Sequence, residues 1–186
     1  VTVEWVDRGG DITYHGPGQL VGYPILKLGK PTAADGRLPQ ADYVGYVRRI
    51  EEMLIRALAR FGIVSGQMNG LTGVWVQPDV ASRCLHCPPA AKLAPSKIAA
   101  IGVKVDARGV SQHGFALNVA PDMSYFDGII PCGIRDHGVL SMADLLDDVP
   151  GMKRVMDAVA EEFGRGFERE TAAADVATDV TTDVAD

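Results

Sequence analysis

The sequence has few cysteines, no basic excess and no long apolar run. Its 186 residues contain three cysteines and carry a formal net charge of −6. A small, odd number of cysteines fits a reducing compartment better than a disulfide-stabilised scaffold. Nucleic-acid phosphates require clustered positive charge, so we expect no nucleic-acid partner.

The chain also lacks signals for a membrane or for secretion. No apolar run approaches the ~20 residues of a membrane span, and the start does not resemble a signal peptide. We therefore expect a cytoplasmic monomer with no membrane partner. The balance of 47% hydrophobic and 23% charged residues predicts one domain over residues 1–170. Residues 171–186 contain only Ala, Asp, Thr and Val, which predicts a disordered acidic tail.

Two periodicities alternate along the chain. A period of two predicts strands at 1–6, 20–26, 97–105 and 110–119, the last two joined by a hairpin turn at 106–109, and a strand, turn and strand over 62–77 with the turn at 66–70. A helical period predicts helices at 43–61, 141–146 and 153–167. We expect an α+β fold: a mixed sheet with helices packed mainly on one side.

The sequence also predicts the place of one strand in the sheet and the surroundings of one helix face. Pro24 would remove a ladder donor and so places its strand near an edge of the sheet. The polar side of the first helix is expected to be a solvated surface; it carries Arg48, Arg49, Glu51, Glu52, Arg56 and Arg60.

Three local features could carry chemistry. Arg8 to Gln19 has five Gly or Pro in twelve positions, so its backbone N–H groups can closely approach a ligand. Cys132 stands between Pro131 and Gly133, where a thiol could be exposed beside an open N–H, although a buried core cysteine is the alternative. Lys97 opens an apolar strand and either extends its amine to solvent or meets a partner.

If Lys97 lay near Cys132, its ammonium would favour the thiolate and so supply nucleophilicity. His15 and His113 each precede a glycine and could position a substrate or act as a base. The segment Cys84-Leu85-His86-Cys87 is weak evidence for zinc or for a redox site, because no second ligand pair accompanies it.

Four motifs in order resemble the lipoyl(octanoyl) transferase family. They are Arg8-Gly9-Gly10-Asp11-Ile12-Thr13-Tyr14-His15-Gly16-Pro17-Gly18-Gln19-Leu20, Lys97-Ile98-Ala99-Ala100-Ile101-Gly102-Val103, His113-Gly114-Phe115-Ala116-Leu117-Asn118-Val119 and Pro131-Cys132-Gly133. The resemblance extends from about Val1 to Leu146. It implies the α+β fold of the biotin and lipoate protein ligases.

The resemblance also implies an activity without a cofactor or metal. An octanoyl group would pass from acyl carrier protein, through a cysteine thioester, to a lysine on the lipoyl domain of a 2-oxoacid dehydrogenase or on the glycine cleavage H protein. Cys132 would be the nucleophile and Lys97 its activator. The implied substrate-binding residues are Arg8, Gly9, Gly10, Asp11, Ile12, Thr13, Tyr14, His15, Ala100, Ile101, Gly102, Gly114, Phe115 and Ala116.

Three alternatives remain open at this point. Members of the family carry a segment of several dozen residues before the first motif, so the sequence is expected to lack an N-terminal segment and could be a catalytically impaired binding module. An ATP-dependent lipoate or biotin ligase on the same fold would not need Cys132. Cys–His chemistry with His15 or His113 as the base would not need Lys97.

Overall fold

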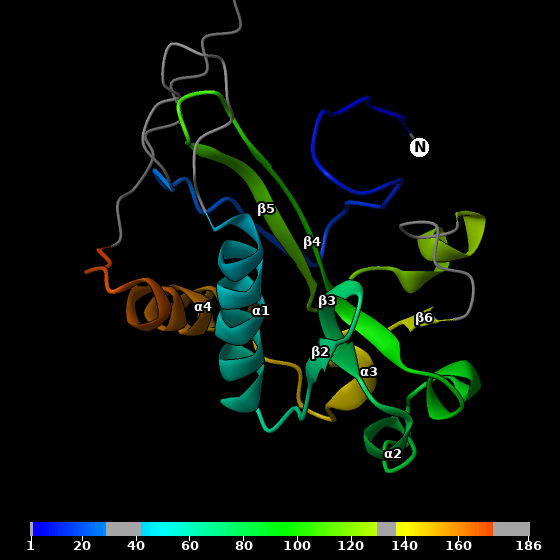
Figure 1. The fold of residues 1–186 in the computed structure, drawn as a ribbon. Coiled ribbons are helices and arrows are strands. Elements are labelled where there is room, and N and C mark those ends of the chain that lie inside the picture. The colour runs from blue at the N-terminus through cyan, green and yellow to red at the C-terminus, as the bar shows by residue number, and fades with distance from the viewer. Residues whose placement is uncertain (1, 29–41, 130–136, 173–186) are drawn as a thin grey trace, which may run out of the picture.

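The computed structural model describes residues 2–28, 42–129 and 137–172. Its strands form one sheet in the order β1-β5-β4-β3-β2, with β6 paired to β4 (Figure 1). The strands are β1 (Gln19–Gly22), β2 (Gly66–Met68), β3 (Leu71–Val76), β4 (Ser96–Val105), β5 (Ser111–Asn118) and β6 (Gly138–Val139). The β4–β6 pair is parallel and the other pairs are antiparallel. The expectation of a mixed sheet is confirmed.

The helices gather mainly on one side of this sheet. They are α1 (Tyr43–Ala59), α2 (Pro78–Ala81), α3 (Met142–Leu145) and α4 (Met152–Phe167), with short 3-10 helices η1 (Pro89–Lys92) and η2 (Met123–Gly128). In Figure 1, α1 and α4 lie together on one face, and the N-terminal arm, residues 2–18, curls over the opposite side. Within the described ranges, no helix has both the length and the hydropathy to cross a bilayer.

Helix α1 forms because its apolar residues recur at three and four. The Asp42 side chain accepts a hydrogen bond of 2.7 Å from the Gly45 N–H and so caps the first turn. The chain leaves the helix at Gly62, whose φ of 79° needs a residue without a Cβ. Buried Ile50, Met53 and Leu54 on this helix pack into the core against the sheet and α4.

The β4–β5 hairpin is the longest paired unit, and it contains the motifs that begin at Lys97 and at His113. Seven residue pairs run from Ala99 opposite Leu117 to Val105 opposite Ser111. The Asp106 carboxylate accepts from the N–H groups of Arg108 and Val110, which fixes the turn. Strand β1 pairs only with β5 and ends before Pro24, so the prediction of an edge strand is confirmed.

The structure corrects several local expectations. Residues 2–6 form no strand: Val3 and Trp5 are exposed, and alternation yields a strand only where a neighbouring strand can pair. The turn between β2 and β3 is limited to Asn69 and Gly70. The segment 79–95, for which no helix or strand was predicted, contains most of α2 and all of η1.

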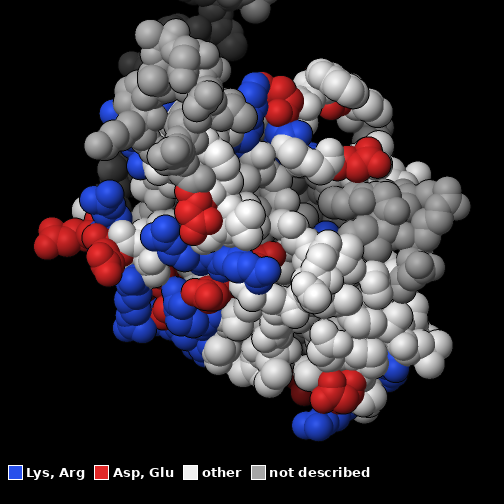
Figure 2. Space-filling model, in the orientation of Figure 1, with Lys and Arg blue, Asp and Glu red and all other residues white. Residues whose placement is uncertain are grey.

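The expected solvated face of α1 is also partly wrong. Glu51 is buried, and its carboxylate accepts a hydrogen bond of 2.9 Å from the Gly73 N–H of β3. Arg56 and Arg60 are not simply solvated either, because they pair with Glu162 and Glu161 of α4 at 3.1 and 2.6 Å. In Figure 2 positive and negative side chains interleave over this side of the molecule. The polar face of α1 therefore contacts α4 as well as solvent.

Candidate functional site

Lys97 owes its orientation to an irregularity in β4. Val74 of β3 pairs with Ala99, and the next residue, Trp75, pairs with Lys97, so Ile98 is an extra residue on β4. Ile98 and Ala99 are both fully buried in the core. The bulge therefore shifts Lys97 to the opposite face of the sheet from the core.

The Lys97 side chain is enclosed on that face. The residue is 8% exposed, and its Nζ lies 4.7 Å from the centroid of the Trp75 ring, in cation–π geometry. Gly73, with φ of 124°, makes room for the lysine stem, since a Cβ there would lie 3.1 Å from Lys97 Cε. The Lys97 carbonyl accepts from the Leu140 N–H at 2.9 Å. Strands β3 and β6 therefore fix the position of this amine.

Polar atoms beside Lys97 are incompletely satisfied. Trp75 Nε1 and His137 Nδ1 are both buried, and neither has a hydrogen-bond partner among the described residues. The two rings meet edge to face with centroids 5.3 Å apart. Because buried polar groups are nearly always paired, the surroundings of Lys97 are incomplete within the described ranges.

The glycine-rich motif and the hairpin together enclose a cavity of about 310 Å³. Ala100, Gly102, Gly114 and Ala116 form its floor, in two directly opposed pairs of β4 and β5. The N-terminal arm forms the opposite wall. In Figure 2 the arm stands as a curl above the hollowed body. A floor with so little side chain leaves space for a slender apolar ligand.

Most of the predicted substrate-binding residues line this cavity. They are Arg8, Gly9, Gly10, Thr13, His15, Ala100, Ile101, Gly102, Gly114, Phe115 and Ala116. Asp11, Ile12 and Tyr14 do not line it. The Asp11 carboxylate accepts from the Ile12 N–H, and Tyr14 stacks on Tyr125 of η2 with ring centroids 4.8 Å apart.

A small second cavity beside Lys97 adjoins the first one. Lys97 and Val139 line it together with Thr13, Ala100 and Ala116, which also line the large cavity. The lysine therefore lines a space next to the cavity on β4 and β5. We call the combined space the slot.

Two amide side chains that sequence reasoning missed organise the lysine end. Gln19 Nε2 donates to the Tyr14 carbonyl at 3.1 Å and to Asn118 Oδ1 at 2.9 Å. Asn118 in turn donates to the Leu140 carbonyl at 3.0 Å, and His15 Nδ1 lies 3.2 Å from Gln19 Oε1. The network ties the arm to the chain beside Lys97. Both amides lie next to the last residue of motifs noted in the sequence, and that position was the available signal.

An ionic cluster anchors the arm at the other end of the slot. The Asp7 carboxylate is paired with Lys104 of β4 and lies 2.8 Å from His113 Nε2 of β5. These two partners, Lys104 foremost, lower the pKa of Asp7 to about 2. His113 adopts φ of 60°, a conformation that costs a non-glycine residue about 1–2 kcal/mol. His113 thus contacts the arm, and the structure does not place it beside Lys97.

Cys132 lies outside the described residues, but both flanks of its segment border the slot. Phe126 of η2 and Val139 of β6 line the small cavity with Lys97. Val139 also pairs with Lys97 in parallel register. The chain that carries Cys132 therefore leaves and returns beside the lysine.

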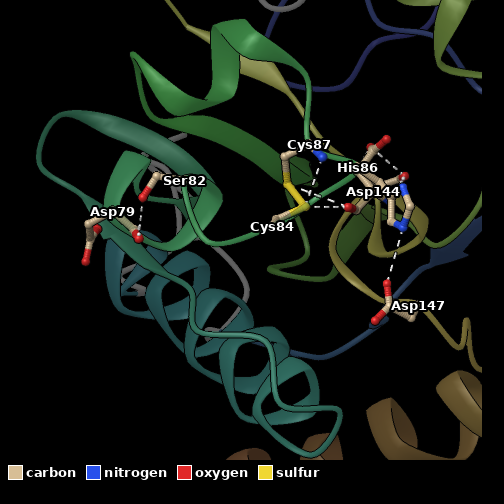
Figure 3. The surroundings of a disulfide bond; sticks show 8 residues. Asp79, Ser82, Cys84, His86, Cys87, Asp144 and Asp147 are labelled. Carbon is tan, nitrogen blue, oxygen red and sulfur yellow. Dashed lines mark hydrogen bonds and ion pairs between the residues drawn. A yellow bond between two sulfur atoms is a disulfide. The ribbon is translucent and has the colours of Figure 1, made fainter.

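The Cys84–Cys87 segment is separate from the slot, since none of its residues lines either cavity. The two cysteines form a disulfide (Figure 3), which closes too short a loop to stabilise a scaffold. The Cys84 Sγ lies 2.7 Å from the Asp144 carbonyl oxygen, and exposed His86 pairs with Asp147 at 3.3 Å. Among the described side chains, no group of three or more His, Cys, Asp and Glu could hold a metal ion.

A larger apolar hollow of about 630 Å³ lies between α4 and the chain following β1. Ile25, Leu26, Met156 and Phe163 are among its lining residues. Among the described residues that line it, none is a lysine, a cysteine or a histidine. The smaller slot is the better candidate, because it combines apolar space with a buried amine.

The site places apolar space beside a buried amine. The fold that carries this site has known counterparts. A bipartite lipoate protein ligase from Thermoplasma acidophilum aligns with a TM-score of 0.63 at 15% identity, over 92% of this chain and 60% of that one. Lipoate-protein ligase A bound with ATP aligns with a TM-score of 0.59 at 16% identity, over 92% and 61%. These likenesses establish the fold.

Family membership follows from the sequence. The family model for the lipoyl protein ligase A/B catalytic domain matches residues 1–164, and the chain belongs to this family. It is 53% identical over 138 residues to the octanoyltransferase of Salinispora arenicola, covering 74% of this chain and 55% of that protein. It is 45% identical over 167 residues to the octanoyltransferase of Chloroflexus aurantiacus, covering 90% and 65%.

The curated relatives are longer than the part that this chain matches. The chain spans between 55% and 65% of the lengths of the relatives just named. Their names confirm the resemblance drawn from the four motifs.

Proposed function

We propose that this protein is an octanoyltransferase of protein lipoylation. It takes an octanoyl group from octanoyl-acyl carrier protein and passes it to a lysine of a lipoyl domain, in 2-oxoacid dehydrogenases or in the glycine cleavage H protein. The observation that carries the proposal is a buried lysine at the end of an apolar slot, in a chain 45–53% identical to octanoyltransferases. We place the reaction in the cytoplasm and expect the protein to act as a monomer.

The first half-reaction forms an acyl-enzyme. The Cys132 thiolate attacks the carbonyl carbon of the carrier thioester, and the bond between that carbon and the carrier sulfur breaks. Lys97 accepts the proton of the Cys132 thiol and returns one to the departing carrier thiolate. The octanoyl chain lies along Ala100, Gly102, Gly114 and Ala116. Burial of Lys97, which is 8% exposed, supports such a proton exchange with little interference from water.

The second half-reaction regenerates the enzyme. The amine of the acceptor lysine attacks the Cys132 thioester, an amide bond forms, and the cysteine sulfur leaves. The proton lost by the amine passes through Lys97 to the sulfur. No nucleotide is required, because the thioester is already activated. The remaining proposed substrate contacts, Asp11, Ile12 and Tyr14, shape the arm around the slot.

The bordering elements support the assignment of Cys132. It lies seven positions before Val139, which pairs with Lys97, and six positions after Phe126, which lines the lysine cavity. A segment whose two flanks border one cavity can deliver a central residue to that cavity. Cys84 and Cys87 line neither cavity and are therefore poor nucleophile candidates.

The test is to mix the protein with octanoyl-acyl carrier protein and locate the adduct by peptide mass spectrometry. We expect one octanoyl group on Cys132, absent in Cys132→Ser and retained in the matched control Cys84→Ser/Cys87→Ser. An ATP-dependent ligase would instead show no adduct and would join free octanoate to a lipoyl domain only with ATP. A binding module without activity would retain the carrier protein and form no adduct.

A separate variant tests Cys–His chemistry. If His15 or His113 were the base, Lys97→Ala would keep most of the rate of adduct formation. Our mechanism predicts that this rate falls steeply in Lys97→Ala.

A further inference from the structure

The Cys84–Cys87 pair lies outside the slot but has the features of a reactive pair of thiols. Its two Cα atoms lie 5.5 Å apart, a separation that a disulfide spans. Only two residues stand between the cysteines, so their disulfide closes a very short loop and gains little from constraining the unfolded chain. Little of the free energy of folding therefore opposes its reduction, and the bond can open in the folded protein.

The two sulfur atoms differ in their access to solvent. Cys87 is 5% exposed and belongs to the core, whereas Cys84 is half-buried and precedes two exposed residues, Leu85 and His86. The Cys87 N–H donates a hydrogen bond of 2.9 Å to Cys84 Sγ (Figure 3), and such a donor stabilises negative charge on that sulfur. Cys84 is therefore the sulfur that a reagent from solvent reaches, and Cys87 closes or opens the bond behind it.

One backbone carbonyl distinguishes the two oxidation states. Cys84 Sγ lies 2.7 Å and Cys87 Sγ 3.6 Å from the carbonyl oxygen of Asp144, which belongs to the last turn of α3 (Figure 3). Carbonyls in the last turn of a helix have no partner within the helix. A thiol can donate its S–H to this oxygen, whereas a disulfide has no proton to donate. Reduction therefore supplies α3 with a hydrogen bond that oxidation removes.

Helix α3 is joined in turn to the strand that carries Lys97. Asp144 Oδ2 accepts hydrogen bonds from the N–H and the hydroxyl of Ser141 at 2.8 and 2.7 Å, which fixes the start of the helix. The preceding residue, Leu140, donates its N–H to the Lys97 carbonyl at 2.9 Å and accepts from the Asn118 side chain at 3.0 Å. A change in the hydrogen bonding of Asp144 thus reaches the backbone beside the buried amine.

We propose that Cys84 and Cys87 form a thiol–disulfide exchange site, whose reduced form stabilises α3 and the backbone beside Lys97. Its oxidising co-reactant is a small disulfide. The Cys84 thiolate attacks one sulfur of that disulfide, and the other sulfur leaves as a thiolate. Cys87 then attacks the Cys84 sulfur and displaces the second small thiol. The two cysteines lose two electrons and two protons, and the small disulfide becomes two thiols; small thiols reverse these steps.

The first test follows this chemistry with glutathione disulfide and dithiothreitol as the probes. Trypsin cleaves after Arg83 and after Lys92, so both cysteines lie in one peptide whose mass reports their state. We expect this peptide to lose two hydrogens with glutathione disulfide and to regain them with dithiothreitol. Cys87→Ser should instead keep one glutathione on Cys84, and Cys84→Ser should react far more slowly at the buried Cys87.

Two results of this test would overturn the exchange site. One is a pair that stays reduced in excess glutathione disulfide or stays oxidised in excess dithiothreitol. The other is one zinc ion per chain retained by the reduced protein and lost in Cys84→Ser, because both sulfurs would then be metal ligands.

The second test measures amide hydrogen exchange by NMR in the oxidised and the reduced protein. We expect the Leu140 N–H to exchange about 2- to 10-fold faster after oxidation, the factor that corresponds to one ordinary hydrogen bond. The Gly45 N–H, which the Asp42 side chain caps on α1, is the matched control and should exchange at the same rate in both states. Equal exchange of the Leu140 N–H in the two states would overturn the effect on α3.

Two double variants separate the lost donor from other effects of oxidation. In Cys84→Ser/Cys87→Ser the hydroxyls can still donate to the Asp144 carbonyl, so the Leu140 N–H should exchange at the rate of the reduced protein. In Cys84→Ala/Cys87→Ala no donor remains, and the rate should be that of the oxidised protein. Neither rate should change with glutathione disulfide; a change in both variants would assign the effect to Cys132 and overturn the proposal. No acyl group is involved, so this proposal and the proposed octanoyl transfer fail separately.

Discussion

The two faces of the sheet are built from the same strands by opposite rules. On the core face Ile98, Val74 and Leu117 are fully or almost fully buried against helices, and their volume fills the space. On the slot face Ala100 and Ala116 present single methyl groups, and the wall above them is largely arm backbone. Large side chains fill the core face, whereas the slot face keeps open space because its residues have small side chains or none.

The two faces also differ in how their polar groups are supported. The slot face contains the lysine amine, the Gln19–Asn118 network and the ionic cluster at Asp7. The core face holds few charged groups among the described residues, and its buried Glu51 accepts from the Gly73 N–H. Function on one face can therefore be changed with little effect on the stability supplied by the other.

The largest effect should come from removing the amine. Lys97→Met keeps most of the stem against Gly73 and Trp75 but cannot exchange protons, so octanoyl transfer should fall by about 10²–10⁴-fold. Rapid-quench kinetics of acyl-enzyme formation measure this rate. Lys153→Met, at an exposed position of α4, is the matched control, and this variant should transfer the octanoyl group at the wild-type rate. A Lys97→Met enzyme with the wild-type rate would remove Lys97 from the mechanism.

Truncation of the adjacent core residue should affect stability instead. Ile98→Ala leaves a cavity beneath the bulge and should lower the free energy of unfolding by about 2–5 kcal/mol. Urea unfolding followed by circular dichroism measures the change. Octanoate affinity under folding conditions should remain close to that of the wild type. If binding fell as steeply as stability, the two faces would not be separable.

Filling the slot should weaken octanoate binding and leave stability nearly unchanged. Ala100→Leu places a branched side chain where the acyl chain would lie, and overpacking of this kind costs about 1–3 kcal/mol, here taken from octanoate binding. Calorimetry should show affinity reduced by about 10-fold or more, with the urea midpoint near that of the wild type. Unimpaired octanoate binding in Ala100→Leu would place the ligand elsewhere.

The smallest expected effect is a pH dependence of the arm. Asp7 has a pKa lowered to about 2 by Lys104 and His113, against an ordinary value of 3.8. Its contribution is complete above pH 3.8 and is lost as the pH falls toward 2. The carboxyl carbon shift of Asp7 should therefore titrate near 2 in the wild type. In Lys104→Met the midpoint should move up toward 3.8, and an unmoved midpoint would contradict the ion pair.

The sequence predicted the regular elements well because their signals are local. Asp42 and Gly62 bracket α1 and Ser141 caps α3, close to the predicted bounds 43–61 and 141–146. The predicted turn at 106–109 joins β4 to β5. Most of the cavity lining was also predicted, since small residues in two motifs became opposed pairs. The strand expected at 1–6 failed because pairing depends on a neighbour that local alternation does not reveal.

The orientation of Lys97 could not have been predicted from its segment. Uninterrupted alternation places Lys97 with Ala99 and Ile101, facing the core. The extra residue at Ile98 reverses this, and it is defined only by the register against β3. The Asp7 cluster likewise joins positions about a hundred residues apart. The expected encounter of Lys97 with Cys132 stays a prediction, because Cys132 lies outside the described ranges.

The most direct test of the slot is to find where octanoate binds. With methyl-labelled alanine, nuclear Overhauser contacts between bound octanoate and the Ala100 and Ala116 methyl groups measure this. We expect both contacts, and their loss in Ala100→Leu. Contacts instead with Ala160, which lines the larger hollow beside α4, would contradict the account, since the chain would then lie far from the Lys97 amine.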